Sequence, residues 1–237
     1  MISKGVVLAG GLGTRLRPMT LVTNKHLLPV YNKPMVFYPI NTLINAGIKD
    51  IMIVTGCEHM GQMINILKSG KEFGCKFSYA VQEEAGGIAQ ALGLCEDFAN
   101  GESVAVILGD NIFEEKFDSK PFDSGARIYL KKVPDPKRFG VPVFNDGKII
   151  AIEEKPNKPK TDYAVTGLYL YENSVFDVIK TLKPSGRGEL EITDVNNHYI
   201  AEGKIDYEIF NGFWSDAGTP DSLLKSSNFV KENNEYF

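Results

Sequence analysis

Short apolar runs alternate with longer amphipathic segments along the first half of the chain. An apolar run of four to eight residues is typical of a buried strand, and apolar residues every three or four positions are typical of a helix. Strands that alternate with helices form a parallel, doubly wound sheet with helices on both faces. We therefore expect an α/β fold with a mostly parallel sheet. The expected strands span residues 4–8, 51–54, 77–81 and 104–108, and the expected helices span residues 34–46, 60–67 and 88–98.

In the second half, three expected strands precede two helices, and a late strand precedes the closing helix. No Pro- or Ser-rich linker, internal repeat or low-complexity segment separates it from the first half. We therefore expect one domain over residues 1–237, with halves of about 1–115 and 116–237. The expected strands span residues 126–133, 148–154, 164–171 and 206–210, and the expected helices span residues 175–182, 189–201 and 220 onward.

The glycine-rich segment after the first expected strand is the main candidate for chemistry. Gly10, Gly11 and Gly13 allow a sharp turn and bring backbone N–H groups close to an anion. Thr14 and Arg15 add a hydroxyl donor and a planar cation suited to phosphate oxygens. The segment predicts a phosphate-binding loop, although a turn that merely closes a β–α connection would have the same glycines.

Two common nucleotide motifs do not fit this segment. A dinucleotide fingerprint requires G-x-G-x-x-G, but Leu16 stands where the third glycine is needed, which counts against a dehydrogenase. A Walker loop requires a Lys directly after its last glycine, and none follows Gly13. Residues 82–87 and Asp110 also follow expected strands. Because ligands bind beyond the carboxyl ends of parallel strands, we expect one site at this edge of the sheet.

Composition narrows the class of protein. Hydrophobic residues at 43% and charged residues at 24% are ordinary for a globular chain, and the net charge is −4. This balance argues against a nucleic-acid binder, which would have a basic face. The N-terminal apolar run stops at Gly10, too short for a signal peptide or a membrane span. Three cysteines without metal-ligand spacing favour a reducing compartment, so we expect a cytoplasmic enzyme that binds no membrane.

The continuation of the glycine-rich segment resembles a known family. Residues 11–16, followed by Pro18, Thr20 and Asn24–Val30, are similar to the sugar-nucleotide pyrophosphorylases, most of all the short glucose-1-phosphate thymidylyltransferases. These nucleotidyltransferases join a nucleoside triphosphate to a sugar 1-phosphate. The resemblance runs from about Lys4 to Leu224. It implies a Rossmann-like nucleotidyltransferase fold with a sugar-binding half inserted at the carboxyl edge of the sheet, and it allows a homo-oligomer.

The resemblance also implies a cofactor, two substrates and a set of site residues. The cofactor is Mg²⁺, and the substrates are dTTP and glucose 1-phosphate. The implied roles are catalysis by Arg15, Lys25 and Asp110; metal binding by Asp110 and Asp216; nucleotide binding by Leu8, Gly10, Gly11, Gly13, Thr14, Arg15, Lys25, His26, Gln82, Gly87, Asp110 and Asn111; and sugar-phosphate binding by Gly140, Glu154, Lys155, Val165, Arg187, Thr193 and Trp214.

The residues alone leave several of these roles open. Asp110 and Asp216 are carboxylates with small or polar neighbours, which suits Mg²⁺, but Asp110 could equally cap a turn. Lys25 and Lys155 lie in expected loops, where most lysines are simply solvated. Arg187 precedes acidic residues that favour a helix N-terminus, so helix-entry chemistry is an alternative to phosphate binding.

Three departures from the family pattern concern binding and regulation. His26 stands where many members have Gln, and Phe139 stands where a Tyr is often found. The chain also ends soon after its closing helix, so we expect no feedback site built from further C-terminal helices.

Two other functions remain open beside the expected reaction. One is a uridylyltransferase that makes UDP-glucose, and the other is an inactive nucleotide-sugar sensor. A sensor could lose the catalytic residues, whereas Arg15, Lys25, Asp110 and Asp216 are all present. No arrangement typical of Ser-His-Asp or Cys-His catalysis appears among the three histidines.

Overall fold

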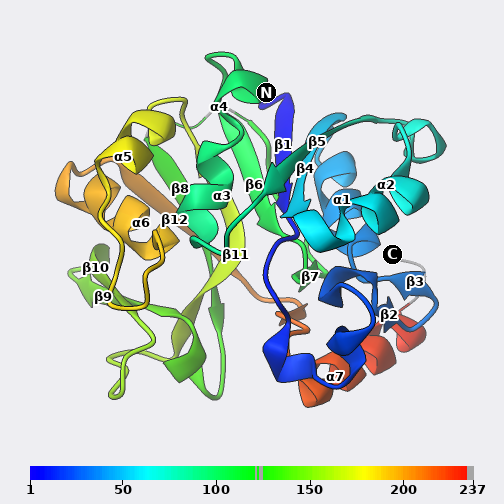
Figure 1. Cartoon of the computed structure of the whole chain (residues 1–237). Helices are drawn as coiled ribbons and strands as arrows, with labels where there is room; N and C mark the ends of the chain where they lie inside the picture. The colour runs from blue at the N-terminus through cyan, green and yellow to red at the C-terminus, as the bar shows by residue number, and fades with distance from the viewer. Residues whose placement is uncertain (121, 123–124, 234–237) are drawn as a thin grey trace.

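A seven-stranded sheet forms the centre of the computed structural model, which describes residues 1–120, 122 and 125–233 (Figure 1). Its order is β12-β8-β11-β6-β1-β4-β5. Strands β4, β1, β6 and β5 pair in parallel, as do β12 and β8, whereas β11 runs antiparallel to both of its neighbours. The sheet strands are β1 (Lys4–Leu8), β4 (Asp50–Gly56), β5 (Lys76–Gln82), β6 (Val104–Leu108), β8 (Ala126–Lys132), β11 (Tyr163–Tyr171) and β12 (Ile205–Phe210).

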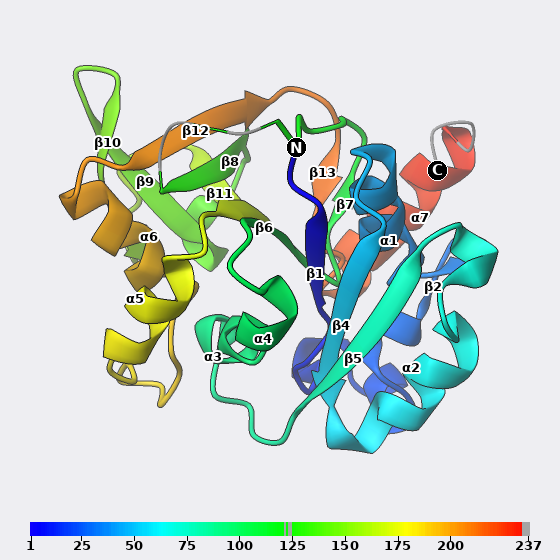
Figure 2. The ribbon, with the colours of Figure 1, turned by 90° about the horizontal axis from the view of Figure 1, so that it is seen from above.

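Helices cover both faces of this sheet, as expected for a doubly wound fold (Figure 2). Helices α1 and α2 pack on one face, and α3, α5 and α6 pack on the other. Along β1 the side chains alternate accordingly, with Val7 in the first core and Val6 and Leu8 in the second. The helices are α1 (Phe37–Asn45), α2 (Met60–Leu67), α3 (Ile88–Gly93), α4 (Glu96–Ala99), α5 (Val175–Thr181), α6 (Ile192–Ala201) and α7 (Pro220–Glu232).

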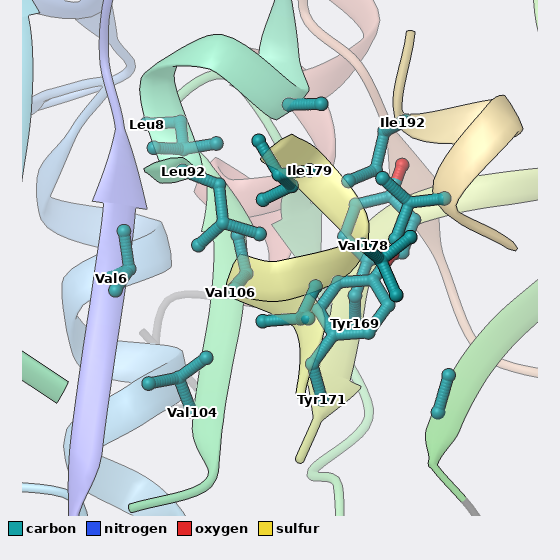
Figure 3. Packing of buried hydrophobic residues seen from close by; sticks show 14 of the residues in the cluster. Val6, Leu8, Leu92, Val104, Val106, Tyr169, Tyr171, Val178, Ile179 and Ile192 are labelled. Atoms are coloured by element: carbon teal, nitrogen blue, oxygen red, sulfur yellow. The ribbon is translucent and has the colours of Figure 1, made fainter. Parts of the chain in front are cut away.

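The second core joins the two halves of the chain. Figure 3 shows Val6, Leu92 and Val106 from the first half close to Tyr169 and Ile179 from the second. All of these side chains are almost fully buried. The two halves therefore share one continuous apolar interior beside the carboxyl ends of β1 and β6.

In the part of the chain that the structure describes, three small sheets lie outside the central one. They are formed by β2 (Pro29–Val30) with β3 (Lys33–Pro34), β7 (Ile112–Phe113) with β13 (Trp214–Ser215), and β9 (Gly140–Asn145) with β10 (Lys148–Glu154). The β9–β10 hairpin lies beside α6 and carries residues of the second half toward the site (Figure 1). Short 3₁₀ helices span Thr14–Leu16, Met19–Leu21, Lys25–Leu27, Cys57–His59, Lys71–Phe73 and Pro136–Arg138.

The structure corrects several expected boundaries. The helix expected over residues 88–98 is two helices, α3 and α4, separated at Leu94 and Cys95 directly after Gly93, a poor helix former. The helix expected from residue 34 begins only at Phe37, because Pro34 pairs within β3. The helix expected from residue 189 begins at Ile192.

No helix in the described part of the chain is long and apolar enough to cross a membrane. The three cysteines are free; Cys57 is exposed, Cys75 half-buried and Cys95 buried.

Candidate active site

Two adjoining compartments open at the carboxyl ends of the parallel strands. Strand β1 lies between β4 and β6 in the central sheet. The chain continues from β1 to β4 on one side and later adds β6 on the other side, so the strand order reverses at β1. Open α/β sheets bind ligands at such a reversal. The larger compartment has a volume of about 910 Å³ and the smaller one about 230 Å³. Arg15, Lys25 and Asp110 line both, so the two compartments share a wall.

The structure describes every predicted site residue, and all of them except Gly13 line one or both of these compartments. The walls combine residues from both halves of the chain. The larger compartment is lined by Leu8, Gly10, Gly11, Thr14, Arg15, Lys25, His26, Gln82, Gly87 and Asp110. The smaller one is lined by Arg15, Lys25, Asp110, Asn111, Gly140, Glu154, Lys155, Val165, Arg187, Thr193, Trp214 and Asp216.

The glycine-rich loop leaves space for two side chains that reach across it. A Cβ added to Gly10 would lie 2.5 Å from Gln82 Oε1. Gly13 has a φ of +57°, and a Cβ there would lie 3.0 Å from the side chains of Lys25 and Thr20. Gly13 therefore lets Lys25 pack closely behind the loop and does not itself face the cavity. By contrast, the space around Gly11 is open.

Lys25 and Asp110 form a close ion pair on the shared wall. Lys25 Nζ lies 2.5 Å from Asp110 Oδ2, and the two side chains are only 17% and 9% exposed. Asn111 Nδ2 donates to the other carboxylate oxygen at 2.9 Å. Burial acts to raise the pKa of Asp110, but the Lys25 ammonium and the other polar neighbours outweigh it and hold that pKa below its usual value. Asp110 is thus a carboxylate at neutral pH.

His26 is a neutral base on the wall of the larger compartment. The side chain is fully buried, and its Nδ1 lies 2.6 Å from Asn24 Oδ1. Burial, and next the Lys25 ammonium, lower the pKa of His26 to about 3. Since the Asn24 oxygen can only accept a hydrogen bond, Nδ1 carries the hydrogen and the buried Nε2 carries a lone pair. Nε2 has no hydrogen-bond partner among the described residues.

Gln82 has its amide oriented by two hydrogen bonds. Its Nε2 donates to the carbonyl oxygen of Gly87 at 3.2 Å and to Gln90 Oε1 at 2.7 Å. The Oε1 atom then faces Gly10. Gln90 was not expected from the sequence, although its position in the first turn of α3 places it beside the loop.

Gly87 lies where this loop packs against the segment that carries Arg187. Its φ is +101° and its ψ is 174°, a conformation open mainly to glycine. A Cβ there would lie 2.4 Å from the carbonyl oxygen of Leu190. The backbone of Leu190 also donates to Gly86 O at 2.7 Å and accepts from Ala89 N at 3.1 Å. Gly87 is therefore required for packing between two loops that line the same cavity.

Asp216 forms ion pairs with two arginines in the wall of the smaller compartment. Its Oδ2 lies 2.6 Å from an Nη2 atom of Arg138 and 3.8 Å from Arg15 Nη1. Arg15 also lies over Gly218, where a Cβ would be 2.9 Å from its guanidinium. Arg138 was missed in the sequence. The available signal was its place in a cationic pair directly before the Phe139-Gly-Val segment.

The residues expected to bind the sugar phosphate form a connected polar network. Thr193 Oγ1 donates to Glu154 Oε2 at 2.6 Å, and Lys155 Nζ lies 3.1 Å from Glu154 Oε1. Arg187 lies 2.8 Å from Glu191 and 3.4 Å from Glu154. Glu191 was not expected as a site residue, and its spacing of four residues from Arg187 was the only signal.

Asn111 and Trp214 are bound to each other rather than turned freely into the cavity. Asn111 Oδ1 accepts from Trp214 Nε1 at 2.7 Å and from the Gly167 backbone N–H at 2.9 Å. Since its Nδ2 donates to Asp110, the whole amide is used inside the protein. Asn111 thereby fixes the Asp110 carboxylate and one wall of the smaller compartment.

The donor set suits Mg²⁺. Asp110 and Asp216 both line the smaller compartment, and no group of three or more His, Cys, Asp or Glu side chains in the described residues is arranged to hold a metal. Mg²⁺ is usually held by one or two carboxylates together with waters and substrate phosphates, so two carboxylates beside a phosphate-sized cavity fit it. A structural zinc site, which needs four protein ligands, does not fit.

Comparison with known proteins gives consistent results. Residues 4–233 match the family model described as nucleotidyl transferase. A glucose-1-phosphate thymidylyltransferase of Neisseria meningitidis is 44% identical over 96% of this chain and 82% of its own length. One from Mycobacterium tuberculosis is 42% identical, with the same coverage of both chains.

Solved structures agree on the fold. A Bacillus anthracis crystal structure assigned as a glucose-1-phosphate thymidylyltransferase, in complex with sucrose, is 53% identical. It covers 97% of this chain and 95% of its own, with a TM-score of 0.91. A UDP-glucose pyrophosphorylase complexed with UDP-glucose has a TM-score of 0.83 at 26% identity, covering 98% of this chain and 100% of its own.

Proposed function

The chain belongs to the nucleotidyl transferase family, and from this premise we propose that it converts dTTP and α-D-glucose 1-phosphate to dTDP-glucose and pyrophosphate. The identity to glucose-1-phosphate thymidylyltransferases supports the choice of substrates. The observation that carries the proposal within the molecule is the wall of Arg15, Lys25 and Asp110, which separates two compartments and faces both. An enzyme that joins two phosphate-bearing substrates needs cations at such a boundary. The family match excludes the dehydrogenase.

The larger compartment would bind the nucleotide. Because the Gln82 amide nitrogen already donates to Gly87 and Gln90, its Oε1 is left to accept from a donor. A pyrimidine such as thymine offers the N3–H donor, whereas the ring nitrogens of adenine are acceptors. The glycine-rich loop and Thr14 would receive the phosphates. The half from about residue 1 to 115 is accordingly the nucleotide half.

The smaller compartment would bind the sugar phosphate, mainly with residues of the half from about 116 to 237. Glu154 presents carboxylate oxygens that accept from sugar hydroxyls, and Gly140 lies close to it. Lys155 and Arg187 supply cations for the sugar phosphate. Both basic side chains now pair with Glu154, so hydroxyl and phosphate binding are linked.

The reaction is an in-line displacement at the α-phosphorus. An oxygen of the sugar phosphate forms the new bond to phosphorus, the bond to the bridging oxygen breaks, and pyrophosphate leaves with that electron pair. A phosphate dianion needs no general base, which agrees with a neutral, buried His26. Lys25 and Arg15 would neutralise charge on the transferring phosphate while the compartments fix the geometry. Asp110 and Asp216 would hold Mg²⁺, which supplies further charge neutralisation when bound.

Two alternative functions, a uridylyltransferase and an inactive sensor, fit these residues differently. The structural likeness to a UDP-glucose pyrophosphorylase keeps a uridylyltransferase open, because Gln82 faces an atom that thymine and uracil share. An inactive sensor is less consistent with the site, since the Lys25–Asp110 pair is close and buried at the boundary of the two compartments.

The proposal is tested by identifying the products. Purified protein with dTTP, glucose 1-phosphate and Mg²⁺ should form dTDP-glucose and pyrophosphate in equal amounts, measured by ³¹P NMR. Asp110→Asn should slow the reaction by about 10² or more, because charge neutralisation in a buried site is worth several kcal/mol. Asp118→Asn, which changes an exposed carboxylate paired with Lys120, is the matched control and should leave the rate unchanged. A wild type that binds dTTP but releases no pyrophosphate would identify a sensor.

A further inference from the structure

Charge in the two compartments is nearly balanced within the protein itself. Six basic and five acidic side chains line them. Of the basic ones, Lys137 alone has no ion pair recorded among the described residues. The pairs are Lys25 with Asp110, Arg15 and Arg138 with Asp216, Lys155 with Glu154, and Arg187 with Glu154, Glu189 and Glu191. Substrates that carry only negative charge must therefore exchange these pairs when they bind.

Arg138 has the closest contact with Asp216. The atoms are 2.6 Å apart, the carboxylate is 13% exposed, and the arginine is 37% exposed. The guanidinium also lies 5.3 Å from the Phe139 ring centroid, a distance at which a cation is attracted to the ring. Arg138 lines both compartments, so it can reach a phosphate from the position in which it now binds Asp216.

Asp216 is one of only two carboxylates to which the proposed function gives a metal-binding role. The Arg138 guanidinium, 2.6 Å from Asp216 Oδ2, occupies one acceptor site of the carboxylate, and its positive charge repels a divalent cation at the same group. The two cations therefore compete for one carboxylate. The second carboxylate, Asp110, is paired in the same way with Lys25.

We propose that Arg138 is a positioning residue that competes with the divalent cation for Asp216 in the free protein and turns to a phosphate oxygen when the substrates bind. The inference rests on the metal-binding role of Asp216 in the proposed function. The exchange makes and breaks no covalent bond. The arginine–carboxylate pair is replaced by an arginine–phosphate pair and a carboxylate–metal pair, so charge stays balanced.

The direction in which metal affinity changes when Arg138 is removed distinguishes this role from a structural one. If Arg138 competes with the metal, removing it strengthens metal binding in the absence of nucleotide. If Arg138 merely holds Asp216 in place, removing it leaves the carboxylate disordered and weakens metal binding. Removing a positive charge anywhere nearby also strengthens metal binding slightly, so a charge-matched control is needed. Lys137 provides it, since it is the adjacent cation and lines the larger compartment.

The experiment is a titration of the purified protein with Mn²⁺, without nucleotide, in which free Mn²⁺ is measured by electron paramagnetic resonance. Arg138→Gln should lower the dissociation constant about fivefold, the upper end of the range for loss of a competing, partly exposed ion pair. Lys137→Gln should change it less than twofold. Adding Asp216→Asn to Arg138→Gln should remove the gain. Arg138→Lys keeps the charge and should give an intermediate value; it decides the matter if Arg138→Gln does not fold.

Three results would overturn the inference: an unchanged dissociation constant in Arg138→Gln, a weakened one, or an equal gain in Lys137→Gln. Failure of the proposed function has a different signature. It would appear as a wild type that forms no dTDP-glucose, whatever the Mn²⁺ titrations give. A wild type that forms the product, with no gain in Arg138→Gln, would reject the role of Arg138 alone.

Discussion

Replacing Gly87 with Ala should damage both substrate sites at once. The residue has a φ of +101° and a ψ of 174°, and a non-glycine residue in this region costs about 1–3 kcal/mol. The added Cβ would also lie 2.4 Å from the carbonyl oxygen of Leu190, so one of the two loops has to move. Together these effects should lower the free energy of unfolding by about 2–4 kcal/mol, or Tm by roughly 4–15 °C for a chain of this size.

Gly101→Ala is the control for backbone strain. Gly101 has a φ of +83°, and a Cβ there would meet no atom within 4 Å. Its cost should be near 1 kcal/mol, without any effect on catalysis. The difference between the two variants therefore measures mainly the contact with Leu190.

The kinetic result distinguishes local damage from coupling between the loops. Gly87 lies beside Gln82, and Leu190 belongs to the segment that carries Arg187. We expect Gly87→Ala to raise KM for dTTP and for glucose 1-phosphate, measured by pyrophosphate release. A variant as stable as Gly101→Ala, or one in which only the KM for dTTP rises, would refute the coupling.

Four further variants test separate parts of the site. Lys25→Ala should mainly lower kcat and Lys155→Ala should mainly raise KM for glucose 1-phosphate; equal, small effects would mean that neither lysine contacts a phosphate. The pKa of His26 is 6.5 in the unfolded chain and about 3 in the folded protein. The free energy of unfolding that the neutral, buried His26 contributes above pH 6.5 is therefore lost as pH falls toward 3. Between pH 7 and 5 the wild type should lose about 2 kcal/mol more than His26→Gln in urea unfolding, and parallel losses would contradict this. Asn111→Ala leaves two buried N–H groups without acceptors and should cost about 2–4 kcal/mol in the same assay; a loss below about 1 kcal/mol would be evidence against that reasoning.

Much of the fold could be predicted because its signals are local. Strands β1, β4 and β6 of the central sheet are mostly buried apolar runs, and the helix at Met60–Leu67 was predicted to the residue. Two boundaries failed where a glycine or a proline acts against the pattern, as in the division of α3 from α4. The antiparallel direction of β11 could not be predicted, since its run of buried residues fits either direction.

The identities of most site residues could be predicted from the sequence, but the contacts between them could not. Asp110, Asp216 and the two lysines have recognisable sequence surroundings. Arg138 was missed because its importance comes from Asp216, which is 78 residues away in the chain. Gly87 was expected to bind the nucleotide, and its contact with Leu190 likewise depends on a distant segment. Ion pairs and backbone packing between distant residues leave no periodic signal in a sequence.

The choice of nucleotide is the most direct test of the proposed function. Thymine differs from uracil by one methyl group, which discriminates by only about 10–200-fold, whereas adenine has no ring N–H for the Gln82 oxygen to accept and should be rejected more strongly. The measurement is kcat/KM for dTTP, UTP, dATP and GTP with glucose 1-phosphate under identical Mg²⁺. We predict that dTTP is preferred, UTP is used measurably, and the purines are scarcely used. A higher value for UTP would make the protein a uridylyltransferase, and efficient use of dATP would contradict the assigned role of Gln82.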